Sequence, residues 1–251
     1  MYDLKQFFAE HPKCALAFSA GVDSSFLLYA ALKYGAEVRA YYVNTAFQPA
    51  FELSMAHRMA EDLGADLRVL EYDILSDPDV AANVPRRCYF CKRRLFTLIR
   101  NAAEADGFSL LLDGTNASDD DADRPGMLAL GELGVRSPLR ECGLTKDKIR
   151  ALSREAGLIT WDMPAYSCLA TRIPSGVVLT EALLHRTEQA EDYMRTLGFT
   201  DFRVRTLGRQ AKLQITADQL PLALERRREI LDTLKQTYDG VLLDLEARNE
   251  H

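Results

Sequence analysis

The sequence predicts an α/β protein, in which a doubly wound parallel sheet is followed by a small α+β domain at the C-terminus. Short apolar runs alternate with stretches of helical spacing through the first two thirds of the 251 residues, and this alternation is typical of βαβ units. Residues 174–176, Pro-Ser-Gly, have the composition of a linker. We therefore expect one domain over residues 1–176 and a second over residues 177–251.

The first strand and the first helix of this pattern enclose a turn of small residues. The apolar run 14–18 predicts a buried strand, and residues 26–34 carry apolar side chains at helical spacing, with Gly35 as the stop. A strand that enters a helix through such a turn directs backbone N–H groups at one place, and the helix N-terminus points there too. The turn over residues 19–25 is therefore a predicted anion site.

Polar side chains in this turn fit a nucleotide phosphate. Ser19, Ser24 and Ser25 offer hydroxyl donors. Asp23 is placed where a carboxylate can hold Mg²⁺ against phosphates. The turn is not a Walker loop, because no Gly-Lys-Ser or Gly-Lys-Thr follows it.

The remaining elements continue the alternation. Further strands are predicted over residues 38–43, 67–72 and 110–113, and helices over 51–63, 91–105 and 146–156. Gly64 and Gly157 end two of these helices, and Thr145 is a suitable N-cap for the last. In such a sheet the ligand site lies at the carboxyl ends of the strands. After the linker we expect a helix over 181–197, paired strands over 202–206 and 211–215, a helix over 221–238 and a strand over 241–245.

Composition favours a globular protein without a large polyanionic partner. Hydrophobic residues make up 47% of the chain, which is enough for a sizeable core. The formal net charge of −6 argues against bulk binding of nucleic acid. The N-terminal residues lack the apolar segment of a signal peptide, and no apolar run has the length of a membrane span. We expect a cytoplasmic protein whose cysteines are thiols.

The five cysteines fall into two groups. Cys88 and Cys91 form a Cys-x-x-Cys pair at the start of a predicted helix, and Cys168 lies in a distinctive segment, whereas Cys14 and Cys142 are interpreted as structural. The pair alone can be a redox pair, half of a zinc site or a coincidence. A second close pair, which a four-cysteine zinc site needs, does not occur in the sequence. Three thiolates would suit a [4Fe–4S] cluster with one open iron.

The run Ser-Ala-Gly-Val-Asp-Ser at residues 19–24 resembles the PP-loop of ATP pyrophosphatases, whose motif is Ser-Gly-Gly-x-Asp-Ser. Those enzymes have an adenine nucleotide alpha hydrolase-like fold. They cleave ATP between the α- and β-phosphates and adenylate a substrate. Ala20 stands where the superfamily usually has glycine. Alanine keeps the backbone N–H, so phosphate binding survives if φ at Ala20 is negative.

A longer set of segments resembles the LarE family of PP-loop sulfur transferases, which help to build the nickel-pincer nucleotide cofactor of lactate racemase. The resemblance covers almost the whole chain. Its most specific part is Cys-Leu-Ala-Thr-Arg-Ile-Pro at residues 168–174, followed by Arg-Val-Arg at 203–205. The other matching segments are 18–25, 87–93, 113–116, 120–126, 137–139 and 160–164.

The resemblance implies a reaction in two parts. A carboxylate of pyridinium-3,5-dicarboxylate mononucleotide is adenylated by ATP with release of pyrophosphate, and sulfur is then inserted to give the thiocarboxylate. The resemblance also implies Mg²⁺, a sulfide donor and a homo-oligomer, without a nucleic-acid or membrane partner. In this view the first domain is the ATP pyrophosphatase, and the second binds the substrate and forms the oligomer.

Cys168 matches the sulfur-handling cysteine of the family. Some members give up the sulfur of that cysteine and end with dehydroalanine. Others carry two further cysteines, at the positions of Cys88 and Cys91, and use a [4Fe–4S] cluster. Because this chain has all three, we expect the cluster form, in which a sulfide on the open iron can be replenished. Sacrificial transfer from Cys168 is the alternative.

The resemblance assigns roles to further residues. Asp23 and Lys92 join Cys168 as catalytic residues, and Lys92 is expected to reach the ATP phosphates. Substrate binding is assigned to Thr171, Arg172, Glu191, Arg203 and Arg205, of which the two last share one strand face. Nucleotide binding is assigned to Ser19, Ala20, Gly21, Asp23, Ser24, Ser25, Asn44, Gly114 and Thr115. Asp120, Asp121 and Asp123 form an acidic run that either binds metal or is a surface loop.

Three other functions remain open at this stage. A PP-loop tRNA thiolase would share the adenylation and the three cysteines, but it needs a basic surface that the net charge of −6 disfavours. A synthetase of the type that forms NAD or GMP would leave the cysteines idle. A module that only senses adenine nucleotides would need neither Asp23 nor the thiols.

Overall fold

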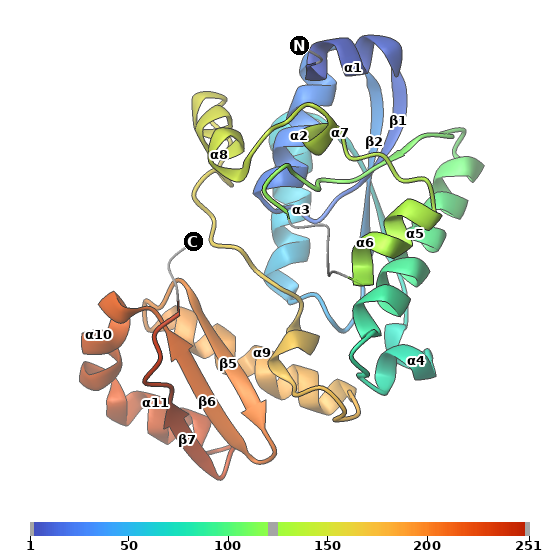
Figure 1. The fold of residues 1–251 in the computed structure, drawn as a ribbon. Coiled ribbons are helices and arrows are strands. Elements are labelled where there is room, and N and C mark those ends of the chain that lie inside the picture. The colour runs from blue at the N-terminus through green and yellow to red at the C-terminus, as the bar shows by residue number, and fades with distance from the viewer. Residues whose placement is uncertain (1–2, 120–124, 249–251) are drawn as a thin grey trace. The chain divides into compact units, whose positions relative to one another are not determined.

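The computed structural model describes residues 3–119 and 125–248, and its contacts divide the chain into two compact units. The first unit takes in the chain up to Asp73 and Arg86–Met163, and the second takes in Ile74–Pro85 and the chain from Pro164 onward (Figure 1). The boundary predicted after residue 176 lies inside the second unit. Asp120, Asp121 and Asp123 lie outside the described residues.

The first unit is built on a four-stranded sheet in which every pairing is parallel. The strand order is β3-β2-β1-β4. The bounds are β1 (Lys13–Ala17), β2 (Glu37–Asn44), β3 (Asp66–Glu71) and β4 (Leu111–Leu112). The prediction of an α/β protein with a parallel sheet is confirmed.

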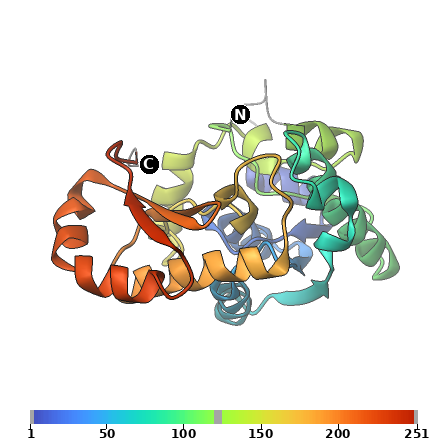
Figure 2. The same ribbon diagram turned by 90° about the horizontal axis from the view of Figure 1, so that it is seen from below.

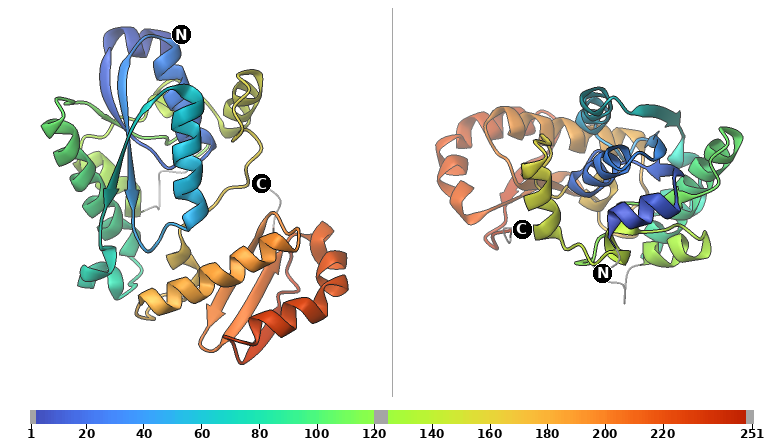
Figure 3. Two further views of the ribbon diagram at one scale, coloured as in Figure 1. Left: turned by 180° about the vertical axis from the view of Figure 1, so that it is seen from behind. Right: turned by 90° about the horizontal axis from the view of Figure 1, so that it is seen from above.

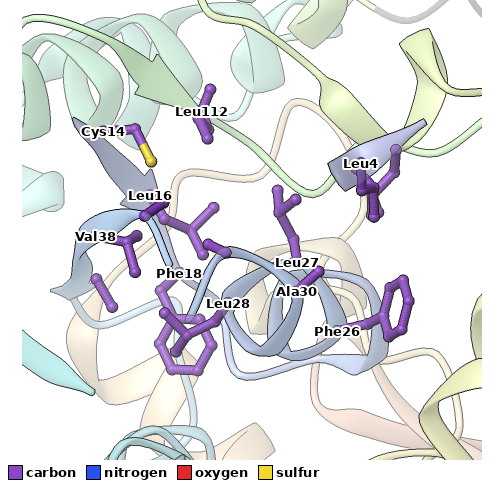
Figure 4. Packing of buried hydrophobic residues seen from close by; sticks show 14 of the residues in the cluster. Leu4, Cys14, Leu16, Phe18, Phe26, Leu27, Leu28, Ala30, Val38 and Leu112 are labelled. Atoms are coloured by element: carbon purple, nitrogen blue, oxygen red, sulfur yellow. The ribbon is translucent and has the colours of Figure 1, made fainter. Parts of the chain in front are cut away.

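Helices cover both faces of this sheet. On one face, Leu16 of β1 and Val38 of β2 share a core with Leu27 and Leu28 of α2 (Val22–Lys33) (Figure 4). On the other face, Tyr41 of β2 packs with Ile99 and Ala103 of the long helix α5. The two faces of the sheet carry different side chains because successive side chains along a strand point to opposite faces. Figure 3 shows α3 (Ala50–Leu63) beside the strands. The other helices of this unit are α1 (Leu4–Glu10), α2, α5 (Arg87–Ala105), α6 (Pro125–Glu132), α7 (Pro138–Glu141) and α8 (Lys146–Glu155).

The strand order reverses between β1 and β4. The chain passes from β1 to β2 and β3 in one direction, and β4 then pairs on the other side of β1. Such a reversal opens a crevice outside the carboxyl ends of the strands, where open α/β sheets bind their ligands. The small-residue turn follows β1, and Gly114 follows β4, so the two lie at this point.

The second unit is a small mixed sheet covered by helices. β5 (Phe202–Leu207) pairs antiparallel with β6 (Gln210–Ile215), which pairs in parallel with β7 (Gly240–Leu243). Figure 2 shows α9 (Glu181–Thr196) running beside these strands. Met194, Val204 and Leu213 lie in its core. The other elements are α4 (Pro78–Ala81), α10 (Leu220–Glu225), α11 (Arg227–Leu234) and the short 3₁₀ turns Ile74–Ser76, Leu169–Arg172 and Ala217–Gln219.

Two details of the predicted pattern were wrong or incomplete. A single helix was expected over residues 221–238, but the structure has two helices that meet at Arg226. The ψ of Arg226 is 10°, which lies outside the helical range. Each of the two helices buries apolar residues of its own. Helix α1 was not predicted. The side chain of Asp3 caps it by accepting a hydrogen bond from the backbone N–H of Gln6 at 2.9 Å. Phe7 and Phe8 of this helix are buried.

The stretch 174–176 is tied into the second unit and is not a loose linker. The backbone N–H of Gly176 and the hydroxyl of Ser175 both donate to the carbonyl of Asn83, at 2.9 and 3.0 Å. The side-chain amide of Asn83 donates back to the carbonyl of Pro174 at 2.9 Å. Asn83 has a φ of 52°, a conformation that asparagine tolerates better than most residues. Over the described ranges, no helix has both the length and the apolar character needed to cross a membrane.

Candidate functional site

A cavity of about 340 Å³ opens at the carboxyl ends of the strands in the first unit. Its walls come from the turn after β1, the end of β2, the first half of α5 and the segment after β4. Phe18, Val43, Leu95, Phe96 and Ile99 make part of the wall apolar. Of the residues predicted to bind nucleotide or act on it, the following line this one cavity: Ser19, Gly21, Asp23, Ser24, Lys92, Gly114 and Thr115.

The turn after β1 is held by its own hydroxyl groups. The Ser24 hydroxyl accepts from the backbone N–H of Ser19 and donates to the carbonyl of Gly21, both at 3.3 Å. The Ser19 and Ser24 hydroxyl oxygens lie 3.1 Å apart. Gly21 is the N-cap of α2 and offers no side chain there. The helix N-terminus therefore opens directly onto the cavity, as an anion site requires.

Ala20 has a φ of +56°, so the condition of a negative φ, under which phosphate binding was expected to survive with alanine here, is not met. The left-handed region costs an L-residue about 1–2 kcal/mol, because its Cβ crowds the following carbonyl. A backbone that turns through this region points successive N–H groups to one side, which makes a concave anion site. The turn thus keeps the conformation that glycine usually supplies, and the Ala20 side chain is buried beneath it.

Gly114 lets the segment after β4 approach this turn closely. A Cβ added at Gly114 would lie 3.0 Å from the backbone N of Ser24 and 3.2 Å from its Cα. Both contacts are to backbone, which cannot move aside cheaply. A glycine is therefore required where β4 and the helix N-terminus meet. Asp113 precedes it and accepts from the hydroxyls of Thr115 and Ser137, at 2.5 and 2.6 Å.

Asp23 has two carboxylate oxygens in different situations. Oδ2 lies 2.7 Å from the Nζ atom of Lys146, at the start of α8. Oδ1 is buried and has no hydrogen-bond partner among the described residues. Burial raises the pKa of Asp23 above its usual value, and the hydrogen bond and charge of Lys146 partly oppose this. An acceptor oxygen left in this state fits a bound cation.

Lys92 lies in the cavity wall on α5 and packs against α6. A Cβ at Gly126 would lie 2.7 Å from Cδ of Lys92 and 3.4 Å from its Nζ. The absence of a side chain at Gly126 therefore leaves room for the lysine stem.

Tyr42 was not predicted as a site residue. It is 1% exposed and lines the cavity, yet its hydroxyl has no hydrogen-bond partner among the residues described. Burial, reinforced by the charges of Glu52 and Glu71, raises the pKa of the Tyr42 phenol well above its usual value, so the group stays protonated. A protonated hydroxyl in such a position can donate a hydrogen bond to a ligand. In the sequence, Tyr42 is indistinguishable from an ordinary core residue of a strand.

Three residues assigned to the nucleotide are not in the cavity wall. Ala20 and Ser25 are buried behind the turn, and the Ser25 hydroxyl has no partner among the described side chains and backbone. Asn44, at the end of β2, donates its side-chain amide to both oxygens of Glu71, at 2.9 and 3.2 Å. Their assigned roles stay predictions.

Cys88 and Cys91 lie in the first turn and a half of α5, in the first unit. Cys88 is exposed and Cys91 is half-buried, and neither is in a disulfide. Nη2 of Arg87 lies 3.6 Å from Sγ of Cys88. Cys14 is fully buried in the core, which raises its pKa to about 12, and burial raises that of Cys142 to about 11. Both therefore stay protonated thiols, as expected of structural cysteines.

Cys168 belongs to the second unit, where it precedes the 3₁₀ turn Leu169–Arg172. It is half-buried and not in a disulfide. Cys88 and Cys91 belong to the first unit, and their predicted joining with Cys168 stays a prediction. Within residues 3–119 and 125–248, no group of three or more His, Cys, Asp and Glu side chains is placed to hold a metal ion.

The residues assigned to the substrate form one network in the second unit. Arg172 and Glu191 make a buried ion pair, with Nε of Arg172 2.7 Å from Oε1 of Glu191, and both side chains are 1% exposed. Thr171 contacts Arg172 through its hydroxyl, at 2.7 Å. Arg203 and Arg205 lie on one face of β5 as expected, and Arg203 is buried. Burial, helped by the charge of Arg172, lowers the pKa of Arg203 to about 10.

Comparisons with curated proteins reveal relatives that match most of the chain. An uncharacterised protein of Synechocystis sp. is 34% identical over 98% of this chain and 93% of its own length. The pyridinium-3,5-bisthiocarboxylic acid mononucleotide synthase of Lactiplantibacillus plantarum is 34% identical over 81% of this chain and 74% of its own length. An uncharacterised protein of Methanocaldococcus jannaschii is 28% identical over 97% of this chain and 93% of its own length. No protein-family model matches the chain.

Proposed function

Since the chain belongs to the LarE family of pyridinium-3,5-bisthiocarboxylic acid mononucleotide synthases, we propose that it is an ATP-dependent sulfur transferase of nickel-pincer cofactor biosynthesis. It adenylates a carboxylate of pyridinium-3,5-dicarboxylate mononucleotide and converts it to a thiocarboxylate. The observation that carries this proposal is the cavity at the strand ends, which gathers the PP-loop residues, Lys92 and Gly114 around the N-terminus of α2.

In the first step, a carboxylate oxygen of the substrate attacks the α-phosphorus of ATP. A bond forms between that oxygen and phosphorus, and the bond to the oxygen that bridges the α- and β-phosphates breaks, so pyrophosphate leaves. The loop N–H groups and hydroxyls of Ser19 and Ser24 bind the phosphates, and Lys92 neutralises charge on the departing pyrophosphate. The acyl adenylate is more reactive than the carboxylate because AMP is a good leaving group.

Mg²⁺ fits the carboxylate of Asp23. Oδ1 of this residue is buried without a partner among the described residues, while Lys146 occupies Oδ2. A hard cation prefers such an oxygen ligand together with phosphate oxygens. When bound, the ion supplies positive charge against the β- and γ-phosphates.

In the second step, a sulfur nucleophile attacks the carbonyl carbon and AMP leaves with the electron pair of the broken C–O bond. The preferred source is sulfide carried by a [4Fe–4S] cluster, which Cys88, Cys91 and Cys168 would hold. Three thiols fit such a cluster by chemistry, and it supplies an iron without a protein ligand that can carry sulfide. In the alternative, the Sγ of Cys168 attacks, and loss of its α-proton with cleavage of its Cβ–Sγ bond leaves dehydroalanine and the thiocarboxylate.

The test is to incubate the purified protein anaerobically with ATP, Mg²⁺ and the dicarboxylate mononucleotide. We expect stoichiometric pyrophosphate and a product whose mass shows oxygen replaced by sulfur. Pyrophosphate released only with tRNA would instead identify a tRNA thiolase. Nucleotide binding without any pyrophosphate would identify a sensing module.

A further inference from the structure

We propose that Glu191 is a positioning residue for Cys168, acting through Arg172, and not a contact to the substrate. This inference rests on the proposed function, in which Cys168 handles sulfur. It is carried by a chain of hydrogen bonds that runs from α9 to the backbone on both sides of Cys168, within the second unit.

The Glu191 carboxylate has no position left for a ligand. Oε1 accepts from Nε of Arg172 at 2.7 Å and from the backbone N–H of Val204 at 3.0 Å. Oε2 accepts from the hydroxyl of Tyr166 at 2.6 Å and from Nη2 of Arg172 at 3.3 Å. A carboxylate offers about four lone-pair sites, and these contacts use them. At 1% exposure the group is also out of reach.

The opposite side of the Arg172 guanidinium holds the backbone around Cys168. Nη1 donates to the carbonyl of Ser167 at 3.0 Å and to the hydroxyl of Thr171 at 2.7 Å. That hydroxyl donates in turn to the carbonyl of Cys168 at 2.8 Å. A planar guanidinium fixes its partners in direction as well as distance. One arginine thus links Glu191 to the residues on either side of the thiol.

Two arginines of β5 hold the ends of the same segment. Arg203 donates through Nη2 to the carbonyl of Ala165, and Arg205 donates through Nη1 to the carbonyl of Thr171 at 2.8 Å. Residues 165–168 form no helix or strand. Guanidinium groups donate to the carbonyls of Ala165 and Ser167, which in regular structure would be bonded to backbone N–H groups.

The ring of Tyr166 completes the arrangement. The guanidinium carbons of Arg172 and Arg203 lie 4.6 and 5.2 Å from its ring centroid. The ring is therefore attracted to both of these like charges. Loss of Glu191 would leave Arg172 as an uncompensated buried charge, and we expect the guanidinium to move out and release the segment.

The experiment compares Glu191→Gln with Asp192→Asn in the full chain. Asp192 is the exposed neighbour on α9 and pairs with Arg195, so the control removes the same charge and leaves the hydrogen bonds of Glu191 to Arg172, Val204 and Tyr166 in place. We measure the rate at which iodoacetamide alkylates Cys168, hydrogen exchange over residues 165–171, and kcat and KM for sulfur transfer. For Glu191→Gln we expect faster exchange, alkylation about fivefold faster or more, and kcat at saturating mononucleotide about tenfold lower or more.

A milder variant keeps the proposal testable if Glu191→Gln does not fold. Tyr166→Phe removes the hydroxyl that donates to Glu191 but keeps the ring. We expect alkylation of Cys168, hydrogen exchange and kcat to change in the same directions as in Glu191→Gln, but by smaller factors. Unchanged alkylation and exchange, with a raised KM for the mononucleotide, would make Glu191 a substrate contact and overturn the proposal. Alkylation and exchange need no turnover. A wild-type protein without sulfur transfer would refute the proposed function and leave this test intact.

Discussion

The Nζ atom of Lys146 lies 2.7 Å from Oδ2 of Asp23, while Oδ1 of the same carboxylate is buried and has no partner among the described residues. The lysine belongs to α8 and the aspartate to the first turn of α2. Burial raises the pKa of this carboxyl group, and the hydrogen bond and charge of Lys146 partly oppose that rise. Asp23 also lines the cavity at the strand ends, where we propose that ATP binds.

We expect Asp23→Asn to abolish adenylation without destabilising the fold. Losing one such electrostatic contact costs on the order of a hundredfold in rate. Because burial raises the pKa of Asp23 in the folded state, the protonated group favours folding at low pH, and this contribution to stability is lost as the pH rises through the folded pKa. The neutral amide should therefore leave the melting temperature equal or higher. Pyrophosphate release and thermal unfolding measure the two effects, and near-normal release would remove Asp23 from the mechanism.

The pH dependence of adenylation should report the Asp23–Lys146 pair. Activity needs the carboxylate, so it falls as the pH drops through the folded pKa of Asp23. Lys146 lowers this pKa, and Lys146→Met should therefore move the acid limb of the profile to higher pH. Pyrophosphate release measured across the acid range checks this, with Lys148→Met on the same helix as the control. An acid limb that stays in place would show that Asp23 does not set it.

Ala20 should tolerate glycine but not a larger side chain. Ala20→Gly relieves a positive φ at the cost of a more flexible unfolded chain, so we expect stability within about 1 kcal/mol of wild type and intact ATP binding. Ala20→Val places a β-branched residue at φ +56° in a buried site, and should cost about 2 kcal/mol or more. Urea unfolding and calorimetric titration with ATP measure both. A fully stable valine variant would mean that the turn relaxes to a negative φ.

Sequence reasoning found the parts of the site that are local in the chain. The turn over residues 19–25 and Gly114 were predicted because small residues at a strand end leave a visible pattern, and the cavity brings them together. Lys146 was missed because it is 123 residues from Asp23 and looks like any first-turn lysine of a helix. Tyr42 was missed for a related reason: nothing in the sequence of an apolar strand marks a tyrosine whose hydroxyl finds no hydrogen-bond partner among the described residues. The φ of Ala20 depends on the packing of the whole turn and could not be derived from residue type.

The same limit applies to the second unit. The sequence predicted that Arg203 and Arg205 share a strand face, which is a property of local period, and β5 confirms it. It could not predict that Arg203 is buried and bonded to the carbonyl of Ala165, because that contact joins residues 38 positions apart. Nor could it predict that Asn83 holds residues 174–176, which a Pro-Ser-Gly composition made look like a linker.

Two neighbouring tyrosines should respond in opposite ways to loss of the hydroxyl. The Tyr42 hydroxyl has no partner among the described residues, and leaving such a group buried costs about 1–3 kcal/mol. Tyr42→Phe should therefore stabilise the ligand-free protein and weaken ATP binding by about tenfold. Tyr41→Phe breaks a hydrogen bond of 2.8 Å to Asp106 and should destabilise the fold by about 1 kcal/mol. Calorimetric titration with ATP and urea unfolding give both values. Unchanged ATP affinity in Tyr42→Phe would show that its hydroxyl does not reach the nucleotide.

Cys88, Cys91 and Cys168 should each be needed for iron binding and for sulfur transfer. The first two are accessible thiols on one stretch of α5, and the third follows a segment held by three arginines in the second unit. Anaerobic reconstitution with iron and sulfide should give one [4Fe–4S] cluster per chain, seen by iron analysis and by absorption in the visible range. Serine at any of the three positions should abolish the cluster and thiocarboxylate formation but leave pyrophosphate release intact.

Cys142→Ser is the matched control for this series. Burial raises the pKa of Cys142 to about 11, so this thiol is a poor iron ligand, and its variant should keep the full iron content. The outcome that contradicts the cluster is specific. If the wild-type protein binds no iron and loses the mass of one sulfur atom at Cys168 after a single turnover, that cysteine is the sulfur donor itself. In that case Cys88→Ser and Cys91→Ser should retain the single turnover, because neither thiol would then take part in the transfer.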